Sequence, residues 1–459
     1  MGLRPKIAPH IDLRVVSVPE TPAVFGFVLL GGAILGATVR DIRLANELAR
    51  RGHEVHVWWV FDLPPNPGLD AKIHQHLLFH AFRYIRSGKP SRILDTLGRI
   101  NTAISPGSFR VRSVQWFPGL IDSMLRGLLK FVCGGVEKDP SLIRRLARQL
   151  DKYNVTHMLP SLEMLAPLVI HARRQSARDI KLLVTFQGYE IYANYARAIG
   201  LEQPLYARLR NVALESDFPA VAVSEDYSQR IQEDIGVPGE QLTVIPPGLT
   251  PARLMERSRA FSLLKQHKIE VHDNVPIVTY FGRVDTEKGL DLLLYAARMV
   301  AERGVKFQFV VCGPSAMGQH YRHVCRDIAE HLRLPVSWCG QISDEVRSAL
   351  YRASRCVVYP SIHREPFGMV PGEAIAHGTP CIVPDKGGVT ELARVGGEKT
   401  GLIFRAWDSG DLATQLHTVL TDEACWNAMS QAGLRTAAEL SVERLGDRIL
   451  AHMGVGGTR

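Results

Sequence analysis

The stretch E-P-F-G-M-V-P-G-E, residues 365–373, follows the apolar run R-C-V-V-Y-P at residues 355–360. The apolar run is typical of a short buried strand. Residues 371–377 are predicted to form a helix that opens with Pro371, at the position where a missing N–H costs nothing. Pro366 excludes Glu365 from the α region, so Glu365 belongs to the loop between the two elements. This order of strand, loop and helix is the repeating unit of an α/β fold.

The two carboxylates of this stretch are expected to flank an anion-binding loop. Glu373 is predicted in the first turn of the helix and Glu365 in the loop before it, with the amides of Phe367, Gly368 and Met369 exposed between them. Such amides bind anions, and carboxylates accept hydrogen bonds from vicinal hydroxyls. The arrangement therefore suits a sugar nucleotide. Each acid also has a plainer explanation, since Glu373 can complement the helix dipole and Glu365 can be a solvated loop residue.

The composition indicates a soluble globular protein of two or three domains. The chain has 459 residues, of which 46% are hydrophobic, and this is enough to build large cores. Its seven cysteines are scattered and form no C-x-x-C pair. This pattern argues against a disulfide framework and against a cysteine zinc site, so the reducing cytosol is the expected compartment.

Residues 23–39 carry no charge and include four glycines. Their length is close to the roughly 20 residues that a membrane helix needs. They lead straight into R-D-I-R-L-A-N-E-L-A-R-R-G-H, an amphipathic pattern at residues 40–53. We interpret residues 23–39 as a glycine-rich loop that feeds a helix, with a membrane span as the less favoured alternative.

Strand and helix patterns alternate in both halves of the chain, which predicts an α/β fold with two doubly wound parallel sheets. The turn-rich P-P-G-L-T-P at residues 246–251 is the expected boundary. It divides an N-terminal domain, 1–249, from a C-terminal domain, 250–438, and residues 439–459 are expected to form a helix that packs back on the first domain. Ligands should bind between the domains, beyond the carboxyl ends of the strands. The expected strands are 13–18, 54–60, 156–160, 181–186, 220–223, 241–245, 276–281, 306–312, 336–339, 356–359, 381–383 and 402–404, with helices at 290–302 and 322–332 among those between them.

Basic residues and turns follow several of these strands. In F-G-R-V-D-T-E-K-G-L, residues 281–290, Lys288 stands before a predicted helix. A cation there is unfavourable by about 0.3 to 1 kcal/mol unless an anion joins it, and local pairing with Asp285 or Glu287 is the alternative. Gly313 and Ile342 lie in turns that either pass beside a flat base or are ordinary turns.

Several motifs between residues 282 and 392 closely resemble those of the retaining GT-B glycosyltransferases of glycosyltransferase family four. They are G-R-V-D-T-E-K-G-L, V-V-C-G-P, E-P-F-G-M-V-P-G-E-A, H-G-T-P-C-I-V-P-D and G-G-V-T-E-L, in this order. The first half agrees more loosely, through G-G at 31–32, V-A-V-S-E at 221–225 and V-I-P-P-G at 244–248. The resemblance implies the GT-B fold, with two Rossmann-like domains facing each other across a cleft. It also implies a retaining hexosyltransferase that needs no metal and acts in the synthesis of cell-surface polysaccharide, glycolipid or glycoconjugate.

The resemblance also implies roles for individual residues. Arg283 and Lys288 would neutralise the diphosphate of the donor sugar nucleotide, Glu373 would hold the ribose hydroxyls, and Glu365 would contact the transferred sugar. The remaining implied contacts are those of Phe367, Gly368, Met369, Val370, Gly313 and Ile342 with the donor, and of Gly31, Gly32, Gln187 and Glu190 with the acceptor or the sugar.

Gln187 departs from the family pattern, because many relatives carry a histidine at the corresponding strand end. Glutamine can hydrogen-bond a hydroxyl or phosphate but cannot act as acid or base. Gln187 and Glu190 are therefore expected to position a substrate. We favour a same-face route in which the leaving phosphate takes the acceptor proton while Arg283 and Lys288 stabilise it. Glu365 acting as a nucleophile is the less favoured alternative.

The net charge of +9 is regional, because residues 81–150 contain thirteen Lys or Arg and four Asp or Glu. Residues 116–132 within them combine apolar helical spacing with Arg126 and Lys130. Such a stretch can rest on an anionic membrane surface and bring the enzyme to a lipid-linked or phosphorylated acceptor. The other expected acceptor is a saccharide. An amphipathic core helix with a solvated basic face is slightly preferred. Nucleic acid is not expected as a partner.

Three other interpretations are weighed against this one. A catalytically silent nucleotide-binding sensor or scaffold remains the alternative function. A dehydrogenase is disfavoured, because G-G-A-I-L-G at 31–36 is not G-x-G-x-x-G. A metal at His74, His76 and His80 is disfavoured for want of a carboxylate at suitable spacing. The expected location is cytoplasmic, with peripheral attachment at the inner face of the membrane as an extension.

Overall fold

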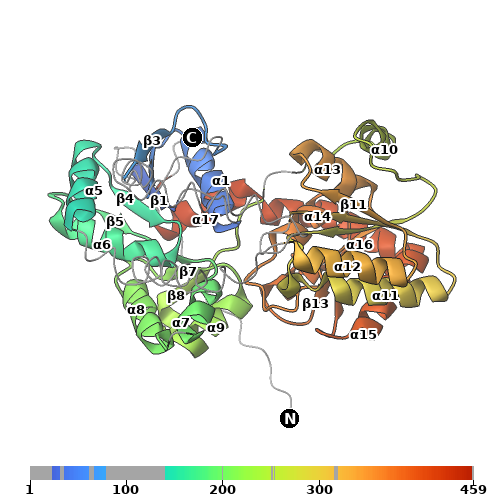
Figure 1. Cartoon of the computed structure of the whole chain (residues 1–459). Helices are drawn as coiled ribbons and strands as arrows, with labels where there is room; N and C mark the ends of the chain where they lie inside the picture. The colour runs from blue at the N-terminus through green and yellow to red at the C-terminus, as the bar shows by residue number, and fades with distance from the viewer. Residues whose placement is uncertain are drawn as a thin grey trace, which may run out of the picture.

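The computed structural model describes residues 23–30, 36–60, 67–78, 140–198, 200–249, 252, 254–314 and 319–456. These residues form two α/β bodies, which lie at the left and right of Figure 1. Each body is built on parallel strands with helices packed against them. The predicted α/β fold with parallel sheets in separate domains is therefore confirmed. The expected strand at 13–18 and the basic stretch at 116–132 lie outside the described residues.

The first sheet is built around β1 (Val24–Leu29), which pairs in parallel with β2 (Glu54–Trp59) on one side and β4 (His157–Pro160) on the other. Its full order is β3-β2-β1-β4-β5. The chain of β5 (Lys181–Leu182) continues into β6 (Thr185–Phe186), which starts a second parallel sheet of order β6-β7-β8. The remaining strands are β3 (His74–Leu77), β7 (Ala220–Ala222) and β8 (Leu242–Val244).

Strand β1 corrects part of the interpretation of residues 23–39 as a glycine-rich loop, because residues 24–29 form a strand. Residues 31–35 lie outside the described residues. Five of the six residues of β1 are buried. Strands β2 and β4 flank it, and other elements cover both faces of the sheet there. A strand that is buried on both faces is apolar throughout. A Cβ added to Gly26 would lie 2.3 Å from Met158 Sδ and 2.8 Å from the Trp58 ring. The expected helix is confirmed as α1 (Gly36–Arg50). None of the described helices is long and apolar enough to cross a membrane.

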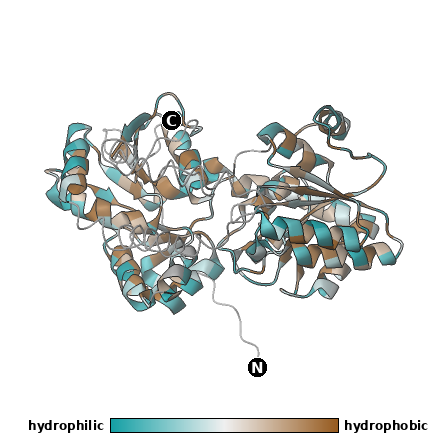
Figure 2. Ribbon diagram, viewed as in Figure 1, coloured by the Kyte–Doolittle hydropathy of each residue, from teal (hydrophilic) through white to brown (hydrophobic). Residues whose placement is uncertain are grey.

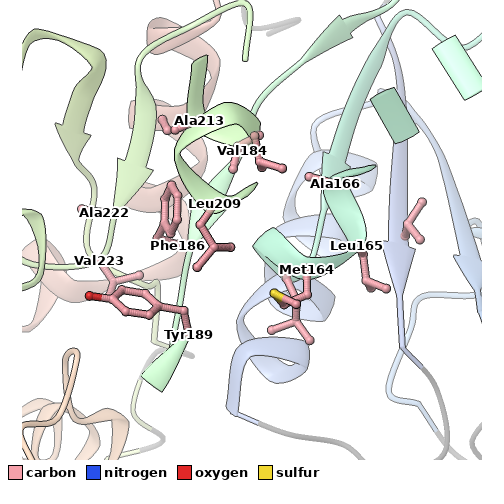
Figure 3. Close-up of a cluster of buried hydrophobic side chains, with 14 of the residues drawn as sticks. Met164, Leu165, Ala166, Val184, Phe186, Tyr189, Leu209, Ala213, Ala222 and Val223 are labelled. Carbon is pink, nitrogen blue, oxygen red and sulfur yellow. The ribbon is translucent and has the colours of Figure 1, made fainter. Parts of the chain in front are cut away.

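Helices pack against the strands of this first body to form two cores. One contains Trp58, Met158 and Leu146, and the other contains Phe25, Phe27 and Leu48. Figure 3 shows part of the first core, where Phe186 and Leu209 pack beside Tyr189. The helices are α5 (Pro140–Lys152), α6 (Ala166–Gln175), α7 (Glu190–Ala198), α8 (Glu202–Leu214) and α9 (Glu225–Ile235), with short 3₁₀ turns at Glu163–Leu165 and Gly239–Gln241.

The second body contains a six-stranded parallel sheet of order β11-β10-β9-β12-β13-β16. Its central strand β9 (Ile277–Phe281) is buried throughout. The chain leaves β9 toward β10 on one side and later returns to β12 on the other, so the carboxyl ends of β9 and β12 mark the switch point where ligands bind in such sheets. The other strands are β10 (Gln308–Cys312), β11 (Val336–Gly340), β12 (Cys356–Val358), β13 (Cys381–Pro384) and β16 (Gly401–Phe404), with a small hairpin of β14 (Arg394–Val395) and β15 (Glu398–Lys399).

The helices of the second body alternate with these strands, and their outer faces are hydrophilic in Figure 2 while the strands are hydrophobic. The helix predicted at 290–302 is confirmed as α11 (Leu290–Glu302), and that at 322–332 is found as α12 (His320–His331). The others are α10 (Arg257–Gln266), α13 (Asp344–Ala353), α14 (Met369–Ala376), α15 (Ser409–Thr421) and α16 (Glu423–Thr436), with 3₁₀ turns at Thr286–Lys288, Gly388–Ala393 and Ala437–Leu440.

The last helix, α17 (Val442–His452), returns to the first body and lies beside α1 (Figure 1). Leu445 and Ile449 join the core around Phe25, and Arg51 Nη1 donates a 2.7 Å hydrogen bond to Asp447. The two bodies are thus joined by the chain near residue 249 and again by α17. The domain boundaries at residues 249 and 438 remain sequence predictions.

Gly26 offers a test of the central strand. Gly26→Ala should lower the free energy of unfolding by about 1 to 3 kcal/mol, because the added methyl overlaps Met158 and Trp58. Gly36→Ala is the control, because nothing lies within 4 Å of its Cβ position, and it should be neutral or slightly stabilising. Urea denaturation measures both. Equal stabilities of the two variants would contradict this account of β1.

Candidate active site

A buried cation and a buried carboxylate meet at the switch point of the second sheet. Lys288, in the turn after β9, donates a hydrogen bond from Nζ to Oε1 of Glu365, in the loop after β12. The two side chains are only 12% and 11% exposed. Ser361 Oγ donates a 2.8 Å hydrogen bond to the same carboxylate oxygen, and Lys288 Nζ lies 3.4 Å from the hydroxyl of Tyr359. The pair is therefore desolvated and also hydrogen-bonded by its neighbours.

Both members of this pair are charged at neutral pH. Burial alone would raise the pKa of Glu365, but the charge and hydrogen bond of Lys288 outweigh burial and hold that pKa below its ordinary value. Burial likewise opposes the charge of Lys288, yet Tyr359 and Glu365 raise the pKa of its ammonium. A fixed ammonium beside a fixed carboxylate can meet a phosphate and a hydroxyl at the same time.

Arg283 contributes a second cation nearby. Its guanidinium binds Asp285 and Glu287, and its side chain is 38% exposed. The local pairing weighed for Lys288 is thus made by Arg283 instead. Glu365 is close enough to help raise the pKa of Arg283, against the opposing effect of burial. The pair with Glu287 is half-exposed on both sides, whereas Asp285 is buried. Half-exposed ion pairs are weak, so the contact with Glu287 is the easier of the two to replace.

The loop before α14 differs from the prediction. Gly368 caps the helix with φ of 100°, so the helix begins at Met369 and not at Pro371. A side chain at Gly368 would be strained at this φ, and its Cβ would lie 2.7 Å from Val389. Phe367 and Gly368 are buried and not exposed as expected. The half-buried Met369 and Val370 are the first helical residues, whose amides have no acceptor within the helix.

Glu373 faces partners of its own. It lies in the second turn of α14, which corrects its predicted place in the first turn. Its carboxylate accepts a 2.9 Å hydrogen bond from Arg43 Nη2 of α1 and a 3.1 Å bond from the hydroxyl of Tyr351, and Arg347 Nε lies 3.6 Å away. The two acids of the 365–373 motif therefore have separate sets of partners. Glu373 also links the second body to the first.

The loop that carries Glu365 is held from both bodies. Ser224 Oγ of the first body donates a 2.6 Å hydrogen bond to the carbonyl of Pro366. Arg364 forms an ion pair with Asp226 at 2.8 Å. From the second body, the amide of Gly388 donates a 2.8 Å bond to the carbonyl of Glu365. These contacts fix the position of the carboxylate.

A network of buried polar groups lies on the first body, at the carboxyl ends of its strands. Gln187 Nε2 donates hydrogen bonds to Asp41 Oδ2 at 2.9 Å and to the carbonyl of Ser161 at 2.5 Å. Asp41 pairs with Arg40 at 2.7 Å. Glu163 is fully buried, and its burial raises its pKa to about 8. In the described part of the chain, Arg40 Nε and Nη2, Ser161 Oγ and Glu163 Oε1 have no hydrogen-bond partner.

Glu190 connects this side to the loop of Glu365. Burial raises the pKa of Glu190 to about 7, and Arg230 Nη1 donates to Glu190 at 3.0 Å and to the carbonyl of Arg364 at 3.4 Å. Glu190 therefore lies beside the loop of Glu365, whereas Gln187 is hydrogen-bonded to Asp41. The sequence reasoning missed Arg40, Asp41 and Glu163, although charged residues directly after apolar strand patterns were a usable signal.

Gly313 and Ile342, the two residues weighed as neighbours of a flat base, lie in different places on the second sheet. Gly313 packs against the end of β9, and a Cβ on it would lie 1.8 Å from the carbonyl oxygen of Gly282. Ile342 lines a depression of about 570 Å³ together with Trp338 and Gln341, and Gly313 is not part of its lining. Within the described residues, no hydrogen bond or ion pair joins Ile342 to Lys288 or Glu365. Gly31 and Gly32 lie outside the described residues.

Comparison with known families covers most of the chain. Residues 36–248 match the family described as "Glycosyl transferase 4-like domain", and residues 264–436 match "Glycosyl transferases group 1". The chain is 32% identical over 262 residues to D-inositol 3-phosphate glycosyltransferase of Rhodococcus erythropolis, a match to 56% of this chain and 55% of that one. It is 26% identical over 203 residues to an uncharacterised glycosyltransferase of Methanocaldococcus jannaschii, covering 44% and 50% of the two chains. The chain thus spans about half the length of the curated relatives it matches.

Solved structures with the same fold include HepE of Anabaena in complex with UDP and glucose. Its TM-score is 0.67 at 17% identity, covering 94% of this chain and 99% of that one. Sucrose-phosphate synthase from Thermosynechococcus elongatus gives a TM-score of 0.69 at 18% identity, covering 94% and 98%. At these identities the likeness shows the fold alone, which is GT-B.

The raised pKa of Glu163 predicts a pH-dependent stability. The unfolded chain ionises Glu163 near its ordinary pKa of 4.5, whereas the folded protein keeps the proton up to about pH 8. Below pH 4.5 Glu163 is protonated in both states, so its burial costs no free energy of ionisation. Between pH 5 and 8 the parent should lose up to about 1.4 kcal/mol of stability per pH unit relative to Glu163→Gln.

Urea denaturation at several pH values measures this difference. The exposed Glu240→Gln serves as the control and should follow the parent. Parallel pH profiles for the parent and Glu163→Gln would contradict the assignment of a protonated Glu163.

Proposed function

Because the chain belongs to the group 1 glycosyltransferases with the GT-B fold, we propose that it transfers a hexosyl unit from a nucleoside-diphosphate sugar to an acceptor hydroxyl with retention of configuration. The observation that carries this proposal is the buried pair of Lys288 and Glu365 at the switch point of the second sheet. A phosphate clamp alone would serve a nucleotide-binding protein. The added carboxylate supplies a contact for the sugar.

The donor diphosphate is assigned to the cations and to the start of α14. Lys288 is charged and nearly buried, and the half-exposed Arg283 is beside it. The free amides of Met369 and Val370 add partial positive charge at the helix N-terminus. These groups can neutralise a diphosphate without a metal ion, so we propose that donor binding is metal-independent.

Glu365 is assigned to the sugar. Because Lys288 holds it ionised, it accepts hydrogen bonds from sugar hydroxyls and is a poor general acid. We favour transfer on one face of the sugar: the bond from the anomeric carbon to the phosphate oxygen breaks, and a bond to the acceptor oxygen forms on the same face. The acceptor proton passes to the departing phosphate, which Lys288 and Arg283 stabilise.

The nucleoside is assigned to Glu373 and its surroundings. A ribose hydroxyl would donate to the Glu373 carboxylate and take the place of one of the bonds from Arg43 or Tyr351. We also assign three further contacts with the nucleotide, to Gly313, Ile342 and Phe367.

The acceptor is assigned to the first body. The unpaired polar atoms of Arg40, Ser161 and Glu163, next to Gln187, suit a compound with several hydroxyls. D-inositol 3-phosphate, in the name of several relatives, belongs to that class. Gln187 and Glu190 would orient the acceptor, and Gly31 and Gly32 would lie near it.

The cellular setting is also a proposal. The scattered cysteines, which form no C-x-x-C pair, favour the cytoplasm. The charge of residues 81–150 favours attachment to the inner face of the membrane and a lipid-linked or saccharide acceptor. This setting fits the synthesis of cell-surface polysaccharide, glycolipid or glycoconjugate.

The first test is of the phosphate clamp. Lys288→Ala should weaken the binding of a nucleoside diphosphate by about 1.5 to 3 kcal/mol, because a charge-assisted contact to phosphate is lost. The binding of the bare nucleoside should stay nearly unchanged. Calorimetry measures both ligands. Lys399→Ala, an exposed lysine on the same body, is the control.

The variant also leaves Glu365 buried without its cation, at a cost of about 3 to 5 kcal/mol. The double variant Lys288→Met, Glu365→Gln removes both charges and keeps the volume, so it separates binding from folding. Equal losses for nucleoside and nucleoside diphosphate would overturn the clamp.

The second test separates an enzyme from a silent binder. Glu365→Gln should bind nucleoside diphosphate within about threefold of the parent while kcat falls at least about 100-fold, because its contact strengthens in the transition state. The control is Glu398→Gln, which removes a carboxylate from a surface ion pair with Arg435 on the same body. If turnover in Glu365→Gln matches the parent, the assignment to the sugar is wrong. A parent that binds nucleotide and turns over no donor would support the silent sensor or scaffold.

A further inference from the structure

A cluster of histidines lies at the edge of the first sheet, away from the Lys288 pair. Glu54 and His56 alternate along β2, and His74 and His76 alternate along β3. The parallel register pairs His56 with His74. Because alternate residues of a strand face the same side, all four side chains share one face.

Three of these side chains are close enough to hold one ion. A ligand atom from each of Glu54, His56 and His74 lies within 4.8 Å of the others, and His56 Nε2 is 2.8 Å from Glu54 Oε1. A tetrahedral ion with bonds of about 2.0 to 2.2 Å needs ligand atoms roughly 3.3 to 3.6 Å apart. Glu54 and His74 are exposed, so small rotations of their side chains can close the difference.

His56 provides a fixed point for such a site. It is 1% exposed, and its ring lies against Tyr153 with centroids 4.6 Å apart. Its other nitrogen, Nδ1, lies 2.9 Å from His76 Nε2. A second hydrogen bond of this kind sets the tautomer and orientation of a metal-binding histidine.

We propose that Glu54, His56 and His74 bind a divalent transition-metal ion, with Zn²⁺ as the first candidate. Two imidazoles and one carboxylate suit Zn²⁺ and leave a fourth position for water. In the described residues β3 pairs only with β2, so the ion would join this short edge strand to the sheet.

The site is separate from the proposed transfer reaction. Glu54 begins β2, whereas the acceptor network lies at the carboxyl ends of the strands, about 16 Å away for a six-residue strand. The expected role of the ion is therefore structural. The sequence showed His74, His76 and His80 but gave no sign that Glu54 and His56 join them, and His80 lies outside the described residues.

The test uses the full chain, freed of any affinity tag and stripped of metal with a chelator. Titration calorimetry with ZnCl2 at pH 7.5 should give one site with a Kd below about 10 μM, and Zn²⁺ should raise the Tm by mass action. His74→Ala and Glu54→Gln should each weaken binding at least about 10-fold. His331→Ala, an exposed histidine on α12, should not.

The outcomes separate this site from the transfer site. His74→Ala should bind nucleoside diphosphate like the parent, so the two proposals can fail independently. Binding weaker than about 10 μM, or equal Zn²⁺ affinity in the parent and His74→Ala, would overturn the metal site.

Discussion

The ion pair between Lys288 and Glu365 is the constraint on which the site depends. Removing two charges from water costs several kcal/mol per ion unless hydrogen bonds and close geometry repay it. Here Ser361 and Tyr359 complete the environment of the pair. The two residues are 77 positions apart and meet because β9 and β12 are neighbours in the sheet. Sheet topology thus brings the two charges together at the carboxyl ends of these strands.

The first body completes this arrangement by holding the same loop. Ser224 and Asp226 bind residues on either side of Glu365, and Arg43 reaches Glu373. Helix α17 ties the end of the chain to α1 and so joins the bodies a second time. Arg230 likewise links the loop of Glu365 to Glu190 on the first body. In the proposed assignment, a donor on the second body faces the buried polar groups around Gln187. The raised pKa values of Glu163 and Glu190 there reflect acids kept in low-dielectric surroundings.

Local sequence predicted much of the fold, because buried parallel strands are continuous apolar runs. Strands β9 to β13 were found at nearly their observed ends, and α11 was found from Leu290 to Glu302. Strand β1 was missed, since the glycines of residues 23–39 also fit a loop. The start of α14 was missed because a proline is a familiar first helical residue, whereas here Gly368 takes the capping conformation. The networks around Asp41 and around His56 depend on neighbours far apart in sequence, which no local pattern shows.

The central claim is most directly tested by following the full chain with a panel of α-linked nucleoside-diphosphate sugars and polyol or saccharide acceptors by proton NMR. The account predicts release of nucleoside diphosphate together with a product whose new anomeric proton has the α configuration from the first time point. A β product would contradict retention, and binding of nucleotide without consumption of any donor would contradict the transferase.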